Sequence, residues 1–519
     1  MSVKREFSLG ILIVLTCSLI PSQVDAAQKI TPGSTCKTLK QKIIYLNKTY
    51  TCIKAGKKSL WNNGVKVVDT PEIIPTPAPE PIKVENVKNA LCALDPNVPE
   101  EWRAYQDFAL KNFNCARPYR YLDAKLPSAT PTSLITQSNE LTSIQDCKIS
   151  NGSRNGSGLI AFTPNPEVDL SKAVNIQIVP VDFTDYPAKE SPLADHEKYF
   201  RYIKDGFSKL SDGHVVINFQ IPSSYIRMEK PIDSYATGGN NGGYASSTAF
   251  AWKNMDTLSY GKDLIAKVDP VIDFKNTDYI MILVPPSVPA SYVSHPQVLP
   301  LFVTNERTIG NVYSIPPVSA VDNGSWFGVE PFLHLHEMMH PMNLVDDHYG
   351  DGEFGRKTGD AGTGNWGIMS GMTTDFLIWD KWVSRMIPDS QFRCAPKNVT
   401  STHWIRPSSI YGDYEKGLVI PISATKVIVV ESMRPAGFNF KLPIESQGAL
   451  VYLINTNLKE HGEGINVLRP ENRKGSIYTT SFILSDAPLK KGESINIEGY
   501  NISVIESGGF GDVIQVKKT

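Results

Sequence analysis

The order of apolar patterns across residues 174 to 284 constrains the fold more than any other feature of this chain. Strand-like runs rich in Val and Ile alternate with stretches in which apolar residues recur at helical spacing. The pattern predicts strands at Val174–Phe183, Val215–Phe219 and Tyr279–Val284, and helices at about Asp195–Gly213 and Leu258–Val268. Strands that alternate with helices are typical of an α/β domain whose helices pack on one sheet.

A different pattern begins near Thr400, where short strand-like runs are separated by turn residues. These runs predict strands at Gly417–Ile422, Lys426–Glu431, Ala449–Ile454, Ser476–Leu484, Ser494–Ile497 and Val513–Val516. We therefore expect a multidomain chain, with an α/β (α+β) domain at 171–397 and an all-β, sandwich-like domain at 398–519.

The N-terminal residues have the features of a secretory signal. Lys4 and Arg5 precede an apolar stretch from Leu9 to Ile20, and Val24-Asp25-Ala26 is a small-residue cleavage site. The apolar stretch is too short to span a bilayer, and no later stretch approaches the required length. The sequence predicts a secreted protein with a signal peptide at 1–26 and no transmembrane segment.

The number of cysteines and the net charge limit the compartment and the class of partner that the sequence allows. Six cysteines remain after the signal, an even number that suggests up to three disulfides in an exported chain: Cys36, Cys52, Cys92, Cys115, Cys147 and Cys394. Cys36 and Cys52 share one short segment and are the expected pair, whereas the pairing of the other four stays open. The formal net charge of −1 and the lack of a long basic run argue against a nucleic-acid partner.

Three regions precede the α/β domain. Residues 27–65 predict a small disulfide module around a two-strand hairpin, similar to short Cys-pair modules next to the signal peptides of actinobacterial exported proteins. This module is expected to be a structural cap or to provide cell-wall or surface association. Residues 66–86 hold a proline-rich linker, and 87–170 a lead-in or propeptide-like region.

His336-Glu337-Met338-Met339-His340 is an HExxH run. On a helix the two histidines lie four residues apart, so both side chains leave one face. Two imidazoles at that spacing can share one zinc ion, and Glu337 can act on the water at the open coordination position. The run predicts a helix from about Pro331 with two metal ligands, His336 and His340, and one catalytic residue, Glu337.

A catalytic zinc site needs a third protein ligand, and Asp346 is the best placed, six residues after His340. Asp346 reaches the metal only if the chain turns sharply. Asn343 is suited to a left-handed turn. Pro341 disfavours helical conformation at the residue before it, so the helix is expected to kink or end at His340.

The surrounding residues leave alternatives open. Asp347 and His348 adjoin Asp346, and either could be the third ligand instead. The acidic, glycine-containing stretch 346–353 could bind Ca²⁺, or it could be a solvated loop. His334 points away from the zinc face of a regular helix and is expected to be a packing or surface residue.

The HExxHxxNxxD pattern resembles the metzincin signature, in which glycine occupies the turn and His or Asp is the third ligand. Within that clan it is most similar to the immune inhibitor A type of secreted bacterial peptidases. Residues 364–371 resemble the Met-turn segment of that family, with Met369 below the metal, and 375–382 resemble the helix that follows. The resemblance runs from about Val174 to the C-terminus, and it implies a metzincin-like catalytic domain with a mixed sheet.

The resemblance also implies a function, a secreted zinc-dependent endopeptidase that hydrolyses protein or peptide substrates with one Zn²⁺ and Glu337. Two alternatives stay open. One is a non-catalytic cell-surface or adhesion protein built on an inactive metallopeptidase fold, and the other is a zinc amidase that acts on cell-wall material. Serine hydrolase chemistry lacks support, because the sequence contains no G-x-S-x-G elbow.

Overall fold

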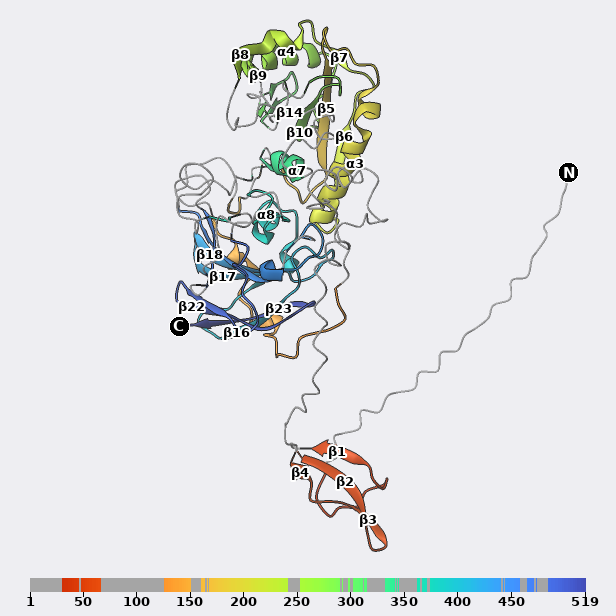
Figure 1. Ribbon diagram of the computed structural model, residues 1–519, viewed down its shortest axis with the longest axis vertical. Coiled ribbons are helices and arrows are strands. Elements are labelled where there is room, and N and C mark those ends of the chain that lie inside the picture. The colour runs from red at the N-terminus through yellow and green to blue at the C-terminus, as the bar shows by residue number, and fades with distance from the viewer. Residues whose placement is uncertain are drawn as a thin grey trace, which may run out of the picture. The chain divides into compact units, whose positions relative to one another are not determined.

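In the computed structural model the chain forms two compact units, Met1–Lys83 and Val84–Thr519 (Figure 1). The structure describes residues 30–45, 48–66, 126–150, 160–163, 166, 168–240, 253–289, 292, 297–298, 302–310, 312–314, 332–340, 342, 344, 362–364, 366–370, 374–439, 442, 444–457, 464–470, 473 and 484–519. The predicted signal peptide at 1–26, most of the predicted linker, Cys92 and Cys115 lie outside these ranges.

The smaller unit is an antiparallel sheet held by a disulfide. Its strands are β1 (Lys42–Tyr45), β2 (Lys48–Ala55), β3 (Lys58–Trp61) and β4 (Val65–Lys66). β2 pairs with each of the other three, so the unit is larger than the predicted two-strand hairpin. The predicted Cys36–Cys52 disulfide is confirmed, with the Cα atoms 5.9 Å apart. The covalent link supplements a small core whose described members are Ile30, Tyr50, Cys52 and Trp61.

The larger unit contains a mixed sheet centred on β5 (Val174–Asp182). The other strands of this sheet are β6 (Ile217–Gln220), β7 (Ile226–Arg227), β10 (Tyr279–Leu283), β11 (Gln297–Val298) and β14 (Val312–Ser314). β6, β7 and β10 run parallel to β5, β14 runs parallel to β10, and β11 is antiparallel. Central parallel strands are buried on both faces, which explains the almost continuous apolar runs of β5 and β10.

Two long helices, α3 (Pro192–Leu210) and α4 (Thr257–Val268), pack on opposite faces of this sheet. Side chains along a strand alternate between faces. The odd-numbered residues of β10 join the core cluster that contains α3, and the even-numbered ones join the cluster that contains α4. All five elements predicted between residues 174 and 284 are present, each with its ends shifted by at most three residues.

The larger unit also contains several shorter helices and strands. The metal-motif helix is α7 (Phe332–Met339), and the helix after the Met-turn segment is α8 (Ile378–Val383). Two small strand pairs are β8 (Ala236–Asn240) with β9 (Lys253–Met255), and β12 (Phe302–Val303) with β13 (Thr308–Ile309). Among the described residues, no helix is both long enough and apolar enough to cross a membrane.

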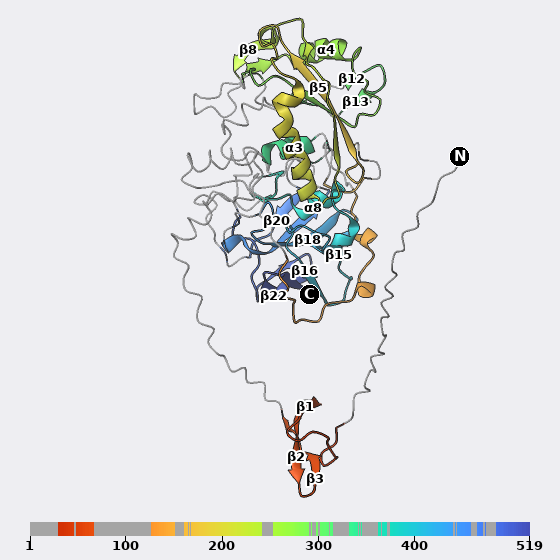
Figure 2. The same cartoon turned by 90° about the vertical axis from the view of Figure 1, so that its right-hand side faces the viewer.

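The C-terminal part consists of two sheets (Figure 2). One has the order β15-β17-β18-β19-β20, with bounds Phe392–Cys394, Gly417–Ser423, Lys426–Met433, Gly448–Asn455 and Ile465–Val467. The other has the order β16-β23-β22-β21, with bounds Ser401–Ile405, Gly511–Lys518, Tyr500–Gly508 and Ser494–Ile497. The four predicted strands near 417, 426, 449 and 494 and the one near 513 are confirmed, whereas residues 476–483 lie outside the described ranges.

The sheet containing β17, β18 and β19 is buried on both faces. One face shares a core cluster with the second sheet, and the other shares a cluster with α3, α7 and α8. The hydrophobic core is therefore continuous across the domain boundary expected at 397/398. A buried ion pair between Lys416 and Asp212, 2.5 Å apart, adds a polar link between the two parts.

Residues 126–150 belong to the folded larger unit. Cys147 forms a disulfide with Cys394 of β15, with Cα atoms 5.9 Å apart. Thr136 donates its backbone N–H to Thr402 O at 2.9 Å, and Thr402 donates its own N–H to Thr136 Oγ1 at 2.8 Å. This part of the predicted lead-in or propeptide-like region is thus joined to the C-terminal sheets by a covalent bond and by hydrogen bonds.

Candidate metal centre

α7 carries His336 and Glu337 of the HExxH run and ends one residue before His340, and its apolar residues fix its rotation. Its sequence has no β-branched residue, and Leu, Met and Glu are good helix formers. Leu335, Met338 and Met339 are buried in the core. α3 packs closely on α7. A Cβ atom added to Gly206 of α3 would lie only 3.2 Å from Leu335 Cδ2 of α7. Burial of this face sets the rotation of the helix and hence the direction of its histidines.

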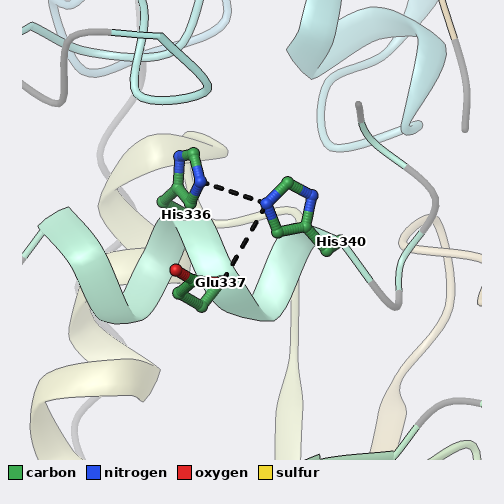
Figure 3. Close-up of side chains that lie close together, drawn as sticks. All are labelled: His336, Glu337 and His340. Carbon is green, nitrogen blue, oxygen red and sulfur yellow. Dashed lines mark hydrogen bonds and ion pairs between the residues drawn. The ribbon is translucent and has the colours of Figure 1, made fainter. Parts of the chain in front are cut away.

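The structure brings His336, Glu337 and His340 together (Figure 3). The Nε2 atoms of the two histidines lie 3.1 Å apart, and their rings are perpendicular, with centroids separated by 4.7 Å. Glu337 Oε2 lies 4.0 Å from His340 Nε2. Among the described residues this is the one group of three His, Cys, Asp or Glu side chains whose ligand atoms all lie within 4.8 Å of one another.

Backbone carbonyls determine which ring nitrogens carry protons. His336 Nδ1 lies 2.8 Å from Ile368 O, and His340 Nδ1 lies 3.1 Å from Leu344 O. A carbonyl oxygen only accepts hydrogen bonds, so each Nδ1 is the donor and, in a neutral ring, each Nε2 has a lone pair. Two lone pairs 3.1 Å apart repel each other unless a proton or a cation lies between them.

This pair of nitrogens could hold a metal ion. Zinc binds imidazole nitrogen at about 2.0–2.1 Å, and an ion at that distance from both atoms would make an N–Zn–N angle of about 100°. This angle is close to tetrahedral, the geometry that zinc prefers. The Nδ1 contacts to backbone carbonyls are also the contacts that orient metal-binding histidines in proteins.

The group is buried on one side and open on the other. His336 is 3% exposed, whereas the side chains of Glu337 and His340 are 16% and 27% exposed. The partly exposed carboxylate and the second histidine leave an approach from solvent. The arrangement can therefore hold an ion on the buried His336 while a water or a substrate reaches Glu337.

After α7 the chain turns back, so that Leu344 lies beside the His340 ring. The helix ends at Met339 and His340 lies in a turn, as the following proline predicts. Leu344 donates its N–H to Met339 O at 2.9 Å, and its carbonyl accepts from the His340 ring. A hydrogen bond that spans five residues in this way is typical of a helix end closed by a left-handed turn. Pro341 and Asn343 lie outside the described residues, so the conformation of Asn343 stays a prediction.

The Met-turn segment lies against the first histidine. Of the segment 364–371, the structure describes residues 364 and 366–370, and Gly364 and Gly367 have φ of +60° and +90°, where a side chain would be strained. Met369 is fully buried, and the residue before it supplies the carbonyl that holds His336. Trp366 anchors the segment, donating from Nε1 to Leu484 O at 2.9 Å. The sequence could not predict this carbonyl contact, because every residue has a backbone carbonyl and the residue type does not show which one accepts the hydrogen bond.

Three other predicted ligand residues, Asp346, Asp347 and His348, lie outside the described residues. The stretch considered for calcium lies there too. His334 is described, and it is a packing residue, 1% exposed, with its ring edge-on to Tyr199 of α3. Burial lowers the pKa of His334 to about 4, so it is neutral at physiological pH.

Compared with known proteins, the sequence matches no family model and no curated protein. The case for a function thus rests on the residues and their geometry.

Proposed function

We propose that this chain is a secreted zinc-dependent endopeptidase of the metzincin type. The observation that carries the proposal is the pair of Nε2 atoms 3.1 Å apart, each with its Nδ1 held by a carbonyl, beside the Glu337 carboxylate. A structural zinc site would have all its ligands closed around the ion. Here a carboxylate and a partly exposed histidine leave room for water and substrate, as a hydrolase requires.

His336, His340 and the predicted third ligand Asp346 would hold the ion. Zinc, when bound, supplies a Lewis acid that polarises the scissile carbonyl and makes a water molecule more acidic. Glu337 accepts a proton from the attacking water on Oε2 and later donates it to the leaving amine nitrogen. The backbone carbonyls of Ile368 and Leu344 keep both imidazoles in one tautomer throughout.

The fold supports the proposal in its arrangement of elements. A mixed sheet, a metal helix with a tightly turned C-terminal end and a buried methionine after glycine turns agree with a metzincin-like catalytic domain of the immune inhibitor A type. Two sheets that share one core agree with a sandwich-like C-terminal region. Protein or peptide substrates follow from the proposed chemistry, and export follows from the predicted signal.

The deciding experiment is a digestion of an unfolded test protein by the purified chain that begins at Ala27. Cleavage that stops after removal of metal by a chelator, and returns on addition of zinc, is the expected result. Zinc binding without cleavage of any protein substrate would instead favour the inactive surface-protein alternative. Release of cell-wall fragments without protein cleavage would favour the amidase.

A further inference from the structure

The smaller unit carries an unusual charge. Between Ile30 and Lys66 the sequence has eight lysines, no arginine and no acidic residue, in a chain whose formal net charge is −1. The lysines are Lys37, Lys40, Lys42, Lys48, Lys54, Lys57, Lys58 and Lys66. Within residues 30–66 there is therefore no acidic side chain that could neutralise a lysine.

The fold gathers these dispersed residues on one small body. All the lysines except Lys66, whose side chain is not described, are exposed. Lys54, Lys57 and Lys58 surround the tight turn between β2 and β3, where Gly56 has φ of +61°. At the other end of β2, Lys48 stands directly opposite Lys66 of β4.

Such an arrangement costs the folded unit free energy. Like charges directly opposite on neighbouring strands destabilise a sheet, and salt screens charges only beyond about 8–10 Å. The lysines that lie close together, Lys48 with Lys66 and those around the β2–β3 turn, therefore repel one another. An anion bound outside the unit removes this repulsion, which gives the unit a strong intrinsic preference for polyanions.

The choice of lysine indicates what kind of anion is recognised. Arginine presents a planar fork for two-point binding of single phosphate or carboxylate groups, whereas lysine is a flexible point charge. Lysines spread over strands and a hairpin tip are suited to a ligand with many charges along a flexible chain. The ligand would be held by charge density and not by a shaped pocket.

Burial of the aromatic residues separates the candidate partners. Proteins that enter a membrane surface expose Trp or Phe beside the lysines, and proteins that grip single-stranded nucleic acid expose aromatic rings for base stacking. The two aromatic side chains that the structure describes in this unit, Tyr50 and Trp61, are only 6% and 9% exposed and belong to its core, and its exposed large apolar side chains, Leu39, Ile53 and Val65, are aliphatic. We propose that the smaller unit is a polycationic anchor that binds a linear, phosphate-bearing polymer and so tethers the larger unit to it.

The test uses the complete chain from Ala27 and long-chain inorganic polyphosphate as the probe, with binding measured over a range of NaCl concentrations. The expected result is binding at about 50 mM salt that weakens steeply as salt rises. In the triple variant Lys54→Gln, Lys57→Gln, Lys58→Gln the slope of log K against log salt should fall by about 2, at about 0.7 per lost contact. Its dissociation constant should rise at least tenfold at about 50 mM salt.

Two control variants make the result specific. Lys189→Gln, Lys262→Gln, Lys275→Gln removes the same charge from exposed positions of the larger unit and should bind as the original chain does. The triple variant Lys54→Arg, Lys57→Arg, Lys58→Arg keeps the charge and should bind as the original chain does. An intact Cys36–Cys52 bond in every variant, checked by mass spectrometry, shows that the unit is still folded.

Several outcomes would overturn the proposal. Equal weakening in the two glutamine variants would mean that overall charge, and not this unit, drives binding. Binding to vesicles of phosphatidylcholine and phosphatidylglycerol but not to polyphosphate would mean that the unit is a membrane-surface module. A clear preference for single-stranded DNA at equal phosphate concentration would mean that it reads nucleic acid, and no binding at low salt would exclude an anchor of this kind.

Discussion

Cys147 and Cys394 are 247 residues apart in sequence, and their disulfide joins the segment before β5 to β15. A covalent bond across so long a loop restricts the unfolded chain strongly. Replacing both cysteines by serine should lower the free energy of unfolding of the larger unit by about 2–5 kcal/mol. Urea unfolding followed by tryptophan fluorescence measures this. The matched variant without Cys36 and Cys52 removes a bond of the other unit and should leave the transition of the larger unit unchanged.

The proposed role of Glu337 as general base is tested by Glu337→Gln. The amide keeps the size of the side chain but cannot accept a proton, so zinc content should stay near one ion per chain while peptide hydrolysis falls by about a hundredfold or more. Metal analysis and a protease assay on the same sample provide both numbers. Full activity in this variant would remove Glu337 from the proposed mechanism.

The third ligand is tested by single alanine variants at Asp346, Asp347 and His348. If Asp346 completes the site, its variant alone should lose zinc, with an affinity lower by about a hundredfold or more in a competition titration. The other two variants should keep the ion. Loss of zinc in the Asp347 or His348 variant instead would transfer the role to that residue.

The link between the Met-turn segment and the metal ligand is tested by Trp366→Phe. The change removes the Nε1–H donor to Leu484 O but keeps an aromatic ring in the core. A looser segment would hold the Ile368 carbonyl less firmly, so zinc affinity should fall by about tenfold. Trp404→Phe is the matched control, because its Nε1 also donates to a backbone carbonyl, Phe510 O, at 2.9 Å. Equal affinities in the two variants would disprove the coupling.

Two buried carboxyl groups predict how stability depends on pH. Burial raises the pKa of Glu431 to about 7, and burial together with the nearby Glu431 raises the pKa of Asp380 to about 8. Between pH 4 and 8 these two carboxyls keep protons in the folded chain that they release in the unfolded chain, so their contribution to stability is greatest at the acid end of this range and declines as pH rises.

Asp380→Asn removes one of these titrations. The change in unfolding free energy from pH 5 to pH 8 should be less negative in this variant than in the original chain, and less negative still when Glu431→Gln is added. Urea titrations at several pH values would show the difference. A pH dependence identical to that of the original chain would mean that these carboxyls are already ionised at pH 5.

The sequence predicts the fold best where burial makes the pattern regular. β5, β10 and β17 to β19 are buried on both faces, so their apolar runs are plain in the sequence. β22 was not predicted, because its outward-facing residues include Asn501, Ser503 and Glu506 and its pairing comes entirely from β21 and β23. β16 was not predicted either, since Thr402 and Trp404 alternate with buried residues over only five positions.

The sequence could predict which side chains form the candidate site, but not their hydrogen bonds to the backbone. Spacing alone places His336 and His340 on one helix face. The carbonyls of Ile368 and Leu344 that set their tautomers depend on tertiary structure. The basic character of the smaller unit was missed for a similar reason, because its longest run of adjacent lysines is Lys57-Lys58 and only folding brings the others near.

The His336–Ile368 hydrogen bond gives the candidate centre a property beyond the proposed catalysis. His336, the first proposed ligand, is oriented by a segment that is itself fastened, through Trp366, to residues more than a hundred positions later. During synthesis, then, the α7 histidines leave the ribosome long before the residues that orient them. Firm binding of an ion by His336 and His340 would therefore require that the C-terminal part of the molecule has already been synthesised and has packed into place.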